Sequence, residues 1–500
     1  MPNPVAGPWN NADLCGERVA VRAGDRRLTY GELRDRIARA ATTYADRGVG
    51  VDDRVLLIAP SIPEFVIAYY ALHTVGATVI TMNVMSTTHE IDYVVGDSGT
   101  SMIVAWHECA EAAEFVAEQR GLPFVELVPY EQDSLDTTPI DAFVERADDA
   151  TAVILYTSGT TGHPKGSELT IANLNAVPAV FRTALATNEH ERWATGLPLF
   201  HCFGQVVVMH NALTERATLS LLSPFTPGEF MNRLRDEHIT IACGVPTMWN
   251  AMLLDDGNHS PDDFADLRLA CSGGASLPGE VIRAFEERFG CTILEGYGLT
   301  ETAGSATFRD LDAAPKPGTV GRPLPGYEAQ ARDADGNPLP PDTVGEIYLR
   351  GPSIMKGYWH RPDATATTLI DDWLATGDLG TIDSDGDIRI VDRKKDLIIR
   401  GGYNVYPREV EEVLYTHPDI VEAAVIGVPD DHYGEEIAAV IALAPGASID
   451  RDALREWCKE RLSAYKVPRI VQVTDALPKG ATGKILKRAI DREALIPAAH

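Results

Sequence analysis

Residues 151–166, TAVILYTSGTTGHPKG, carry the strongest structural signal in the 500-residue chain. The first part, TAVILYT, is a short run of apolar and β-branched residues, which predicts a buried strand. The second part is rich in Gly, Ser and Thr and holds one lysine, Lys165. A strand that feeds such a loop is a common phosphate-binding arrangement, because backbone amides and hydroxyls donate to phosphate oxygens. The loop differs from the common G-x-x-x-x-G-K-[ST] phosphate loop, since Pro164 precedes the lysine and Gly166 follows it.

Apolar runs like this strand recur through the first three hundred residues and alternate with helical patterns. Two amphipathic patterns, at residues 29–48 and 279–290, each end at a glycine and predict helices. Further runs that predict strands are at residues 54–60, 77–82, 101–106, 124–128, 239–245, 267–273 and 291–298. This alternation predicts an α/β fold with layered, largely parallel sheets.

The character of the sequence changes twice in its last third. From about residue 318 to 391 it is rich in Gly and Pro with short strand-like runs, which predicts a small β subdomain. From about residue 396 to 500 helical and strand-like patterns alternate again, which predicts a separate small α+β domain. Several domains are also expected from length alone, since one hydrophobic core rarely serves 500 residues.

One apolar segment, residues 65–82, holds no formal charge over eighteen residues and is long enough to be tested as a membrane span. Gly76 interrupts it, and Pro60 and Pro63 stand just before it. These residues favour a buried helix that ends near the glycine, followed by a buried strand. We therefore predict no transmembrane segment.

The charge and cysteine content narrow the class of protein. The formal net charge is −29, which argues against nucleic-acid binding and against unaided docking on anionic membranes. The seven cysteines are scattered and form no C-x-x-C pair, which favours free thiols in a reducing cytoplasm. The first fourteen residues show no basic region followed by an apolar one, so no signal peptide is predicted. The expected location is cytoplasmic.

Three aspartates, Asp383, Asp385 and Asp387, are spaced as in a calcium-binding loop. However, Gly386 is misplaced for such a loop and no glutamate closes a twelve-residue unit. The pattern therefore predicts a solvated hairpin turn between two strands.

Four further segments accompany the Gly-rich loop in a fixed order: EGYGLTETAG (295–304), WLATGDLG (373–380), DRKKDLIIRGGYNVYPREVEEVL (392–414) and LPKGATGKILKR (477–488). Together the five segments resemble the adenylate-forming, or AMP-binding, superfamily, which includes acyl-CoA synthetases, stand-alone adenylation domains and luciferases. The resemblance covers nearly the whole chain and points to the branch of acyl-CoA synthetases that are fatty acid–CoA ligases. It implies a large N-terminal domain (1–391), a hinge (392–395) and a small mobile C-terminal domain (396–500).

The resemblance implies that the chain binds ATP with Mg²⁺. Tyr297 is expected beside the adenine, Thr300 at the α-phosphate, and Glu301 at Mg²⁺, which prefers oxygen ligands. The β- and γ-phosphates are expected to contact Thr157, Ser158, Gly159, Thr160, Thr161, Gly162 and Lys165. The other expected ATP-binding residues are Gly274, Ala275, Ser276, Glu295, Gly296 and Gly298, with Asp378 and Arg393 at the ribose hydroxyls.

Lys484 is implied to be the catalytic lysine of the family. Attack of a carboxylate on the α-phosphate brings two anions together, and an ammonium group between them stabilises the transition state. After this step the small domain is implied to rotate about Lys395. Lys484 then leaves, and a pantetheine thiol reaches the carbonyl along the loop at Gly401, Gly402 and Tyr403.

The segment LPLFHCFGQ (197–205) resembles the part of acyl-CoA ligases that borders the acid. His201 is expected at the carboxylate end, and the other candidate acyl-pocket residues are Phe203, Gly204, Val207, Met209, Val245, Trp249, Gly273 and Gly274. No acidic residue stands between His201 and Gln205 to pair with an α-ammonium group, which disfavours an amino acid. No Arg or Lys stands there for a dicarboxylate, so an apolar monocarboxylate is predicted.

The leading hypothesis is an ATP-dependent ligase that makes acyl-CoA from a medium- or long-chain fatty acid. One alternative is an acyl-AMP ligase that loads the phosphopantetheine arm of an acyl carrier protein. Another is a CoA ligase for an aryl or short-chain acid. A third, a degenerate nucleotide sensor, has little support because Thr300, Glu301, Asp378 and Lys484 are all present.

Overall fold

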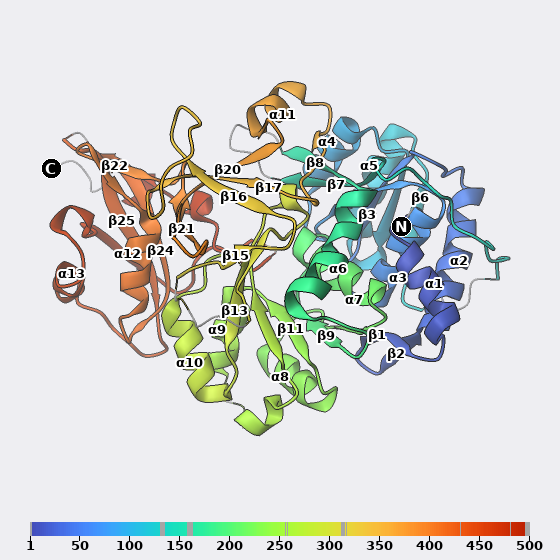
Figure 1. The fold of residues 1–500 in the computed structure, drawn as a ribbon, viewed down its shortest axis with the longest axis horizontal. Coiled ribbons are helices and arrows are strands. Elements are labelled where there is room, and N and C mark those ends of the chain that lie inside the picture. The colour runs from blue at the N-terminus through green and yellow to red at the C-terminus, as the bar shows by residue number, and fades with distance from the viewer. Residues whose placement is uncertain are drawn as a thin grey trace.

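The computed structural model describes residues 3–130, 136–157, 164–255, 257, 259–311, 316, 318–430, 432–480 and 482–495. Within these residues the strands form four sheets, with helices packed around them. Figure 1 shows the C-terminal residues, in orange and red, on one side of the molecule and the N-terminal residues, in blue, on the other. The predicted α/β class is confirmed. The predicted domain limits at residues 391 and 396 stay predictions.

The first sheet contains the strand that opens the Gly-rich segment. Its strand order is β18-β8-β7-β4-β3-β5-β6, with parallel pairing from β7 to β6 and antiparallel pairing of β8 with β7 and β18. The strands are β3 (Arg54–Ile58), β4 (Thr78–Met82), β5 (Met102–Trp106), β6 (Phe124–Leu127), β7 (Thr151–Thr157), β8 (Lys165–Thr170) and β18 (Gly357–Tyr358). Thr157 and Lys165 are paired at the end of the β7–β8 ladder, so the residues that flank the Gly-rich segment lie opposite each other.

The second sheet has the order β15-β14-β13-β12-β11-β9-β10-β1-β2. Its strands from β13 to β1 run parallel, and β14, β15 and β2 are antiparallel additions. The strands are β1 (Val19–Ala23), β2 (Arg26–Thr29), β9 (Arg192–Thr195), β10 (Thr218–Leu221), β11 (Ile241–Gly244), β12 (Leu269–Ser272), β13 (Ile293–Tyr297), β14 (Thr307–Phe308) and β15 (Arg322–Pro323).

The third sheet is antiparallel and lies within the range predicted for the β subdomain, reaching just past its end. Its strands are β16 (Glu328–Arg332), β17 (Gly345–Arg350), β19 (Leu369–Ile370), β20 (Trp373–Ile382) and β21 (Ile388–Arg393). The fourth sheet belongs to the C-terminal residues and mixes both directions. Its strands are β22 (Ile398–Arg400), β23 (Tyr403–Val405), β24 (Ile420–Asp430), β25 (Gly434–Leu443) and β26 (Ile470–Thr474).

Most of the helices bury part of their surface against the rest of the fold. Two predicted helices form close to their expected limits: α2 has a Thr29–Glu32 capping box, and α10 ends at Gly290 in the left-handed conformation. The helices are α1 (Ala6–Cys15), α2 (Tyr30–Asp46), α3 (Pro63–Thr74), α4 (Thr88–Ser98), α5 (Ala110–Arg120), α6 (Ile171–Leu185), α7 (Asn211–Thr214), α8 (Pro227–Asp236), α9 (Pro246–Leu254), α10 (Gly279–Phe289), α11 (Pro362–Thr368), α12 (Pro407–Tyr415) and α13 (Arg451–Lys459).

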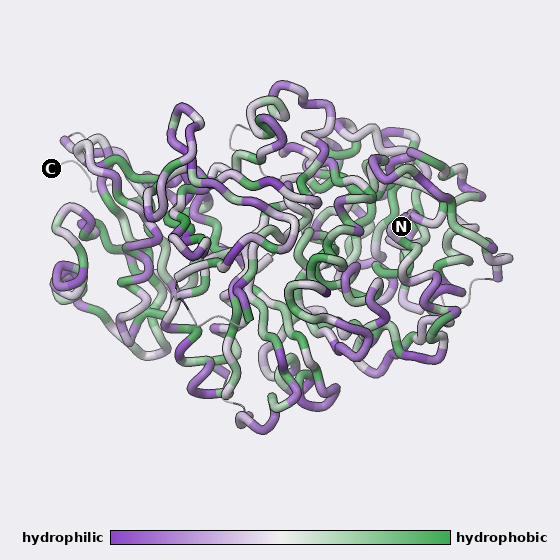
Figure 2. Tube along the Cα trace, in the orientation of Figure 1, coloured by the Kyte–Doolittle hydropathy of each residue, from purple (hydrophilic) through white to green (hydrophobic). Residues whose placement is uncertain are grey.

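The largest hydrophobic core unites buried residues of the first two sheets and the helices beside them. Along the chain trace in Figure 2, apolar residues gather in the strands of the interior and polar residues in the outer turns. A separate core lies under β22, β24 and β25 in the C-terminal part. The cavity described below is lined by residues of the largest core together with Thr482, Lys484 and Leu486 of the C-terminal part.

The apolar segment at residues 65–82 is confirmed as a buried helix and strand. Helix α3 is buried along its whole length, Gly76 adopts a φ of +85°, and β4 follows as a fully buried strand. Among the helices of the described residues, none combines the length and the apolar character needed to cross a bilayer. All seven cysteines are free thiols.

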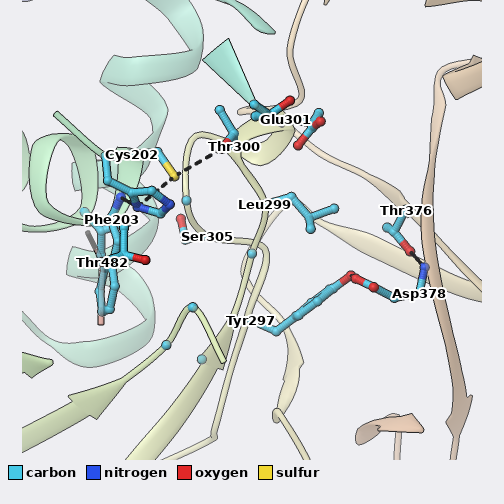
Figure 3. A pocket seen from close by; sticks show the side chains of 18 of the residues that line it. Cys202, Phe203, Tyr297, Leu299, Thr300, Glu301, Ser305, Thr376, Asp378 and Thr482 are labelled. Carbon is cyan, nitrogen blue, oxygen red and sulfur yellow. Dashed lines mark hydrogen bonds between the residues drawn. The ribbon is translucent and has the colours of Figure 1, made fainter. Parts of the chain in front are cut away.

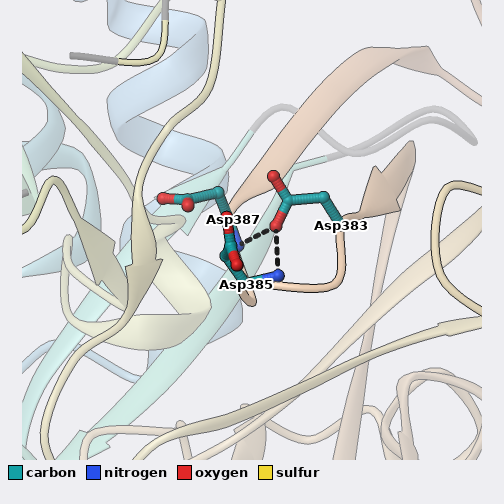
Figure 4. Close-up of side chains that lie close together, drawn as sticks. All are labelled: Asp383, Asp385 and Asp387. Carbon is teal, nitrogen blue, oxygen red and sulfur yellow. Dashed lines mark hydrogen bonds between the residues drawn. The ribbon is translucent and has the colours of Figure 1, made fainter. Parts of the chain in front are cut away.

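The three aspartates form the predicted turn between β20 and β21 (Figure 4). The Asp383 carboxylate accepts the amides of Asp385 at 2.9 Å and Asp387 at 3.0 Å, which fixes the turn. The Lys316 ammonium lies 2.6–2.8 Å from a carboxylate oxygen of each aspartate. Arg322 also pairs with Asp387 at 3.1 Å, so two cationic side chains of the same chain offset part of the cluster's charge, as expected of a structural turn.

Candidate active site

A cavity of about 750 Å³ lies where the carboxyl ends of β11, β12 and β13 meet the β7–β8 hairpin, the third sheet and the C-terminal residues. Ligands of α/β proteins bind outside the carboxyl ends of parallel strands, so this position suits a substrate site. One end of the cavity is polar and the other apolar. We call them the polar end (Tyr297, Thr300, Glu301, Asp378, Arg393) and the apolar end (Phe181, Val207, Cys243, Val245, Cys271, Phe308).

The polar end is organised around Asp378, which is buried although charged. The Tyr297 hydroxyl donates to one carboxylate oxygen at 2.6 Å (Figure 3), and Arg393 Nε lies 3.4 Å from the other. Asp378 and Arg393 are also backbone partners in the β20–β21 ladder. The Asp378 amide in turn donates to Thr376 Oγ1 at 3.1 Å. The ladder and these bonds hold the carboxylate at the cavity wall.

Glu301 lies on a short 3-10 turn, Thr300–Thr302, directly after β13. The Tyr358 hydroxyl donates to its carboxylate at 2.8 Å, and Lys165 Nζ lies 5.2 Å from the centre of the Tyr358 ring. Thr300 and Glu301 both line the cavity, on the same side as Thr157 and Lys165. An oxygen donor set of this kind, with a carboxylate and a hydroxyl, fits Mg²⁺ held together with substrate phosphates.

Lys484 enters the cavity from a tight hairpin of the C-terminal residues. The Gly480 amide donates to the Lys484 carbonyl at 2.8 Å, and the Gly483 amide donates to the Gly480 carbonyl at 2.9 Å. Burial lowers the pKa of Lys484 to about 8; the charge of Arg393 acts in the same direction and that of Asp378 opposes it. The ammonium group is therefore a cation at neutral pH that loses its proton more easily than an exposed lysine.

His201 also lines the cavity. Burial, and to a smaller extent the charge of Lys484, lowers the pKa of His201 to about 4, so the ring is neutral at physiological pH. Its Nδ1 accepts the Phe203 amide at 3.3 Å, which leaves the proton on Nε2. The Cys202 thiol lies 3.7 Å from His201 Nδ1 and 3.8 Å from Thr300 Oγ1, and burial raises its pKa to about 12 (Figure 3). The ring is positioned to donate a hydrogen bond rather than to carry charge.

The apolar end is lined by side chains from five separate segments. Val207 comes from a π-helix (Phe203–His210), an element that is rare and often marks functional sites. Cys243 and Cys271 are neighbours across β11 and β12. The rings of Phe181 and Phe308 lie 6.4 Å apart, centre to centre. Within the described residues, no Asp, Glu, Lys or Arg belongs to this end of the cavity.

Close contacts with neighbouring atoms leave no room for a side chain at Gly273 or Gly204. A Cβ at Gly273 would meet the Phe203 ring at 3.2 Å, and one at Gly204 would meet the Pro198 carbonyl at 2.5 Å. Gly274 has a φ of +79°. All three line the cavity, together with the predicted residues Phe203, Val245, Gly296 and Gly298.

Several predicted site residues do not line the cavity, and the reason is the direction of their side chains. Met209 and Trp249 are fully buried in hydrophobic cores, and the Trp249 ring packs 5.5 Å from Phe285, behind α9. Glu295 turns away and accepts the Leu277 amide at 2.9 Å, so it supports the strand end instead. Ala275 and Ser276 are likewise outside the lining. Met209 and Trp249, predicted for the acyl pocket, are thus not among the residues that line this cavity.

Two groups of predicted residues are not among those observed at the cavity. Ser158, Gly159, Thr160, Thr161 and Gly162 are outside the described residues, so only their flanking residues, Thr157 and Lys165, are observed at the cavity. The predicted thiol-tunnel residues Gly401, Gly402 and Tyr403 are on the surface of the C-terminal part. Tyr403 is 61% exposed and stacks near Tyr465 at 4.9 Å.

The structure also brings together residues that sequence reasoning missed. Tyr358 holds Glu301, and Thr376 holds the Asp378 amide. Glu346 accepts the Gly377 amide at 3.1 Å and pairs with Lys394 at 3.0 Å. Thr376 had a local signal, since it stands two residues before Asp378. Tyr358 and Glu346 had no local sequence signal, because they reach the site through pairing between strands that are far apart in the chain.

Three groups meet at the carboxyl ends of the parallel strands: a buried carboxylate, a carboxylate suited to Mg²⁺, and a lysine from the C-terminal part. This fold and cavity define a class of protein, the two-domain enzymes that use a nucleotide. The chain belongs to the AMP-binding enzyme family. The family's main profile matches residues 9–359, and the profile of the AMP-binding enzyme C-terminal domain matches residues 409–484.

The curated relatives match over almost their whole length. The chain is 39% identical over 498 residues to a feruloyl-CoA synthase of Amycolatopsis sp, which covers 98% of this chain and 99% of the relative. It is 33% identical over 519 residues to a long-chain-fatty-acid–CoA ligase of Bacillus subtilis, which covers 95% of this chain and 92% of the relative.

Solved structures agree with the fold. The ATP-bound MatB from Rhodopseudomonas palustris superposes with a TM-score of 0.92 at 31% identity, covering 99% of this chain and 98% of that chain. A benzoate CoA ligase from Burkholderia xenovorans superposes with a TM-score of 0.90 at 28% identity, covering 98% and 99%. The chain is accordingly an AMP-forming CoA ligase that uses ATP, Mg²⁺, CoA and a small-molecule carboxylic acid.

Proposed function

We propose that this ligase activates an apolar aromatic monocarboxylate, of the phenylpropenoate type exemplified by ferulate, and transfers it to CoA. The observation that carries the proposal is the apolar end of the cavity, whose described lining includes two phenylalanine rings and no formal charge. The similarity of the chain to a feruloyl-CoA synthase supports the same class of acid. This choice differs from the fatty acid predicted from the sequence, which the comparisons do not confirm.

The cavity volume supports a compact acid. Pockets for a single small ligand occupy about 300–1,000 Å³. Here about 750 Å³ must serve both the nucleotide and the acid. Phe181 and Phe308 stand at the apolar end, and aromatic pairs favour ring substrates through edge and offset contacts. A planar ring next to a carboxylate uses such a space better than a long flexible chain, which also loses more rotamer freedom on binding.

In the first proposed step, a carboxylate oxygen of the acid attacks the α-phosphorus of ATP, and pyrophosphate leaves. Asp378 would accept the ribose hydroxyls while Tyr297 and Arg393 fix its orientation. Thr300 would donate to the α-phosphate and Lys165 would lie at the β- and γ-phosphates, where residues 158–162 are also expected. Mg²⁺, held with Glu301, would supply charge neutralisation between the phosphates.

Lys484 would lie between the attacking carboxylate and the α-phosphate, where its charge offsets the repulsion between the two anions. The neutral His201 would donate from Nε2 to the carboxylate oxygen of the acid, next to the apolar end. A neutral donor orients the carboxylate without forming an ion pair that would lower its nucleophilicity. In this proposal His201 orients the acid, and Lys484 stabilises the charge of the transition state.

In the second proposed step, the CoA thiolate attacks the acyl carbonyl and AMP leaves as the phosphate–carbonyl bond breaks. Lys484 occupies the cavity in this structure, whereas Gly401, Gly402 and Tyr403 are on the surface. We propose that rotation about Lys395 exchanges these two faces and brings the loop to the cavity. Such a movement commits the enzyme to one half-reaction at a time.

The test is a kcat/KM comparison with ATP and CoA across ferulate, cinnamate, benzoate, octanoate, palmitate, acetate and malonate, with products identified by mass spectrometry. We expect the phenylpropenoates to exceed acetate by roughly a hundredfold, since about three buried methylene equivalents supply most of that factor. A preference for palmitate would instead favour the second candidate, a long-chain acid, which the Bacillus subtilis relative supports. A parallel reaction with an acyl carrier protein in place of CoA tests the acceptor.

A further inference from the structure

Helix α9 contacts the C-terminal part directly beside Lys484. Thr247 Oγ1, in the first turn of the helix, donates to the Gly483 carbonyl at 3.0 Å. Asn250 Nδ2 donates to the Val421 carbonyl in β24 at 3.3 Å. Thr247 and Asn250 are three residues apart, so they lie on the same face of the helix. One helix face therefore makes two hydrogen bonds across the boundary between the two parts of the molecule.

The contact with Gly483 is close and specific. A Cβ at this position would lie 2.8 Å from Thr247 Oγ1 and 3.3 Å from Val245 Cγ2, and its φ is +75°. Both the missing side chain and the left-handed conformation are therefore needed for the hairpin to approach α9. Gly483 precedes Lys484 in the chain, and its amide closes the hairpin onto Gly480 at 2.9 Å. The direction in which Lys484 leaves the hairpin depends on this backbone.

The same turn of chain also borders the apolar end of the cavity. Val245, just before α9, lines that end and touches the position of Gly483 through its Cγ2 atom. Its other methyl, Cγ1, lies 3.6 Å from the position of a Cβ at Gly274. Residues 245–247 therefore contact the wall of the acid site on one side and the lysine hairpin on the other.

We propose that Thr247 is a positioning residue for Lys484: its hydrogen bond to the Gly483 carbonyl holds the lysine hairpin against the large domain during adenylate formation, with Asn250 as a second hold on the same arrangement. The inference rests on the proposed role of Lys484 in the first half-reaction and on nothing about which acid is used. Neither side chain lines the cavity, so Thr247 acts through the hairpin and Asn250 through β24.

The test compares Thr247→Val, which keeps the shape but removes the donor, with Thr247→Ser, which keeps the hydroxyl. The matched control is Thr183→Val, since Thr183 Oγ1 makes a 3.0 Å bond to the Ala179 carbonyl inside α6. Three quantities are measured: ATP–pyrophosphate exchange, thioester formation from synthetic acyl-AMP and CoA, and hydrogen exchange of residues 479–486 in the free enzyme.

We expect Thr247→Val to lower kcat for pyrophosphate exchange by about three- to tenfold, the factor expected for one lost hydrogen bond. Thioester formation from acyl-AMP should be unchanged or faster, and amide exchange at Gly480 and Gly483 should rise. Thr247→Ser should restore all three, and Thr183→Val should change none of them. Adding Asn250→Ala should lower exchange activity further, because both bonds hold one arrangement.

Full adenylation activity in Thr247→Val, an equal fall in both half-reactions, or failure of Thr247→Ser to restore the rate would each overturn the proposal. Unchanged hydrogen exchange of the hairpin would overturn it as well. A wild-type enzyme that forms no adenylate with any acid would refute the proposed function instead. The hydrogen-exchange comparison still tests the contact in that event, because it needs no substrate.

Discussion

The two ends of the cavity are built in different ways. At the polar end each side chain is held by a named partner: Tyr297 and Arg393 hold Asp378, and Tyr358 holds Glu301. At the apolar end the side chains of Val207 and Val245 have only packing contacts, like those of other buried core residues. The polar end is thus specified by hydrogen bonds, and the apolar end by shape.

This difference predicts which properties can change independently. A polar group that loses its partner in a buried site costs the full desolvation of the remaining group, so the polar end should tolerate little change. An apolar wall can gain or lose a methyl group at a modest cost, so the acid preference should change while ATP use is kept. Substitutions at the two ends should therefore separate the kinetics of ATP from those of the acid.

The largest effect is expected for Lys484→Ala. Removing the cation should lower adenylate formation by about 10²–10³-fold, as for other preorganised groups that stabilise a charged transition state. Thioester formation from synthetic acyl-AMP should remain near the wild-type rate, since we propose that Lys484 leaves the cavity for that step. Lys459→Ala, on the exposed face of α13, is the control. An equal loss in both half-reactions of the folded variant would contradict the assigned role.

Asp378→Asn tests the polar end without removing the shape of the side chain. The substitution weakens the bonds from Tyr297 and Arg393 and removes the charge that we expect to accept the ribose hydroxyls. Hydrogen bonds to charged groups contribute about 1.5–3 kcal/mol, so KM for ATP should rise by roughly ten- to a hundredfold. KM for the acid should stay within about twofold. Asp452→Asn, in the exposed first turn of α13, should change neither value; a rise in KM for the acid alone would contradict the division of the cavity.

The sequence predicts the polar end of the cavity better than the apolar end. The polar residues Tyr297, Glu301 and Asp378 stand in short motifs, because one ligand, ATP, demands particular donors and acceptors at fixed spacing. The α/β fold and the strand positions were also predictable, since buried strands and amphipathic helices have their own periodicities. All three of these polar residues line the cavity, and their roles toward ATP stay predictions.

The apolar end could be predicted only in part. Val207 lines the cavity and Met209 does not, although both are apolar residues of one π-helix. Trp249 was predicted to border the acid but packs against Phe285 on the far side of α9. Which face of a buried helix meets a cavity depends on the packing of the rest of the fold, and composition alone carries no signal for it. Cys243 and Cys271 were missed because their strands read as ordinary core.

The pH dependence sharpens the role assigned to Lys484. Its pKa, lowered to about 8 by burial, means that the fraction carrying the positive charge falls as the pH rises through 8. kcat/KM for adenylate formation should therefore decline above pH 8 and be about tenfold lower near pH 9. Thioester formation from synthetic acyl-AMP should not follow this curve. Lys484→Arg, which keeps its charge at these pH values, should remove the decline; a rate that rises between pH 8 and 9 would contradict the assignment.

The smallest effect is expected from a comparison of alanine substitutions at Val207 and Met209, two residues of the π-helix. Val207→Ala should enlarge the apolar end and shift the ratio of kcat/KM values toward bulkier ring-substituted acids by about three- to tenfold, since the acid covers only part of the lost side chain. KM for ATP should be unchanged. Met209→Ala should leave that ratio unchanged but lower the free energy of unfolding by about 2–5 kcal/mol, because it opens a void in a closed core. Urea unfolding and the acid panel measure the two outcomes on the same samples. A shift in acid preference from Met209→Ala, with none from Val207→Ala, would mean that the acid lies on the other face of this helix and that the apolar end defined here is not its binding site.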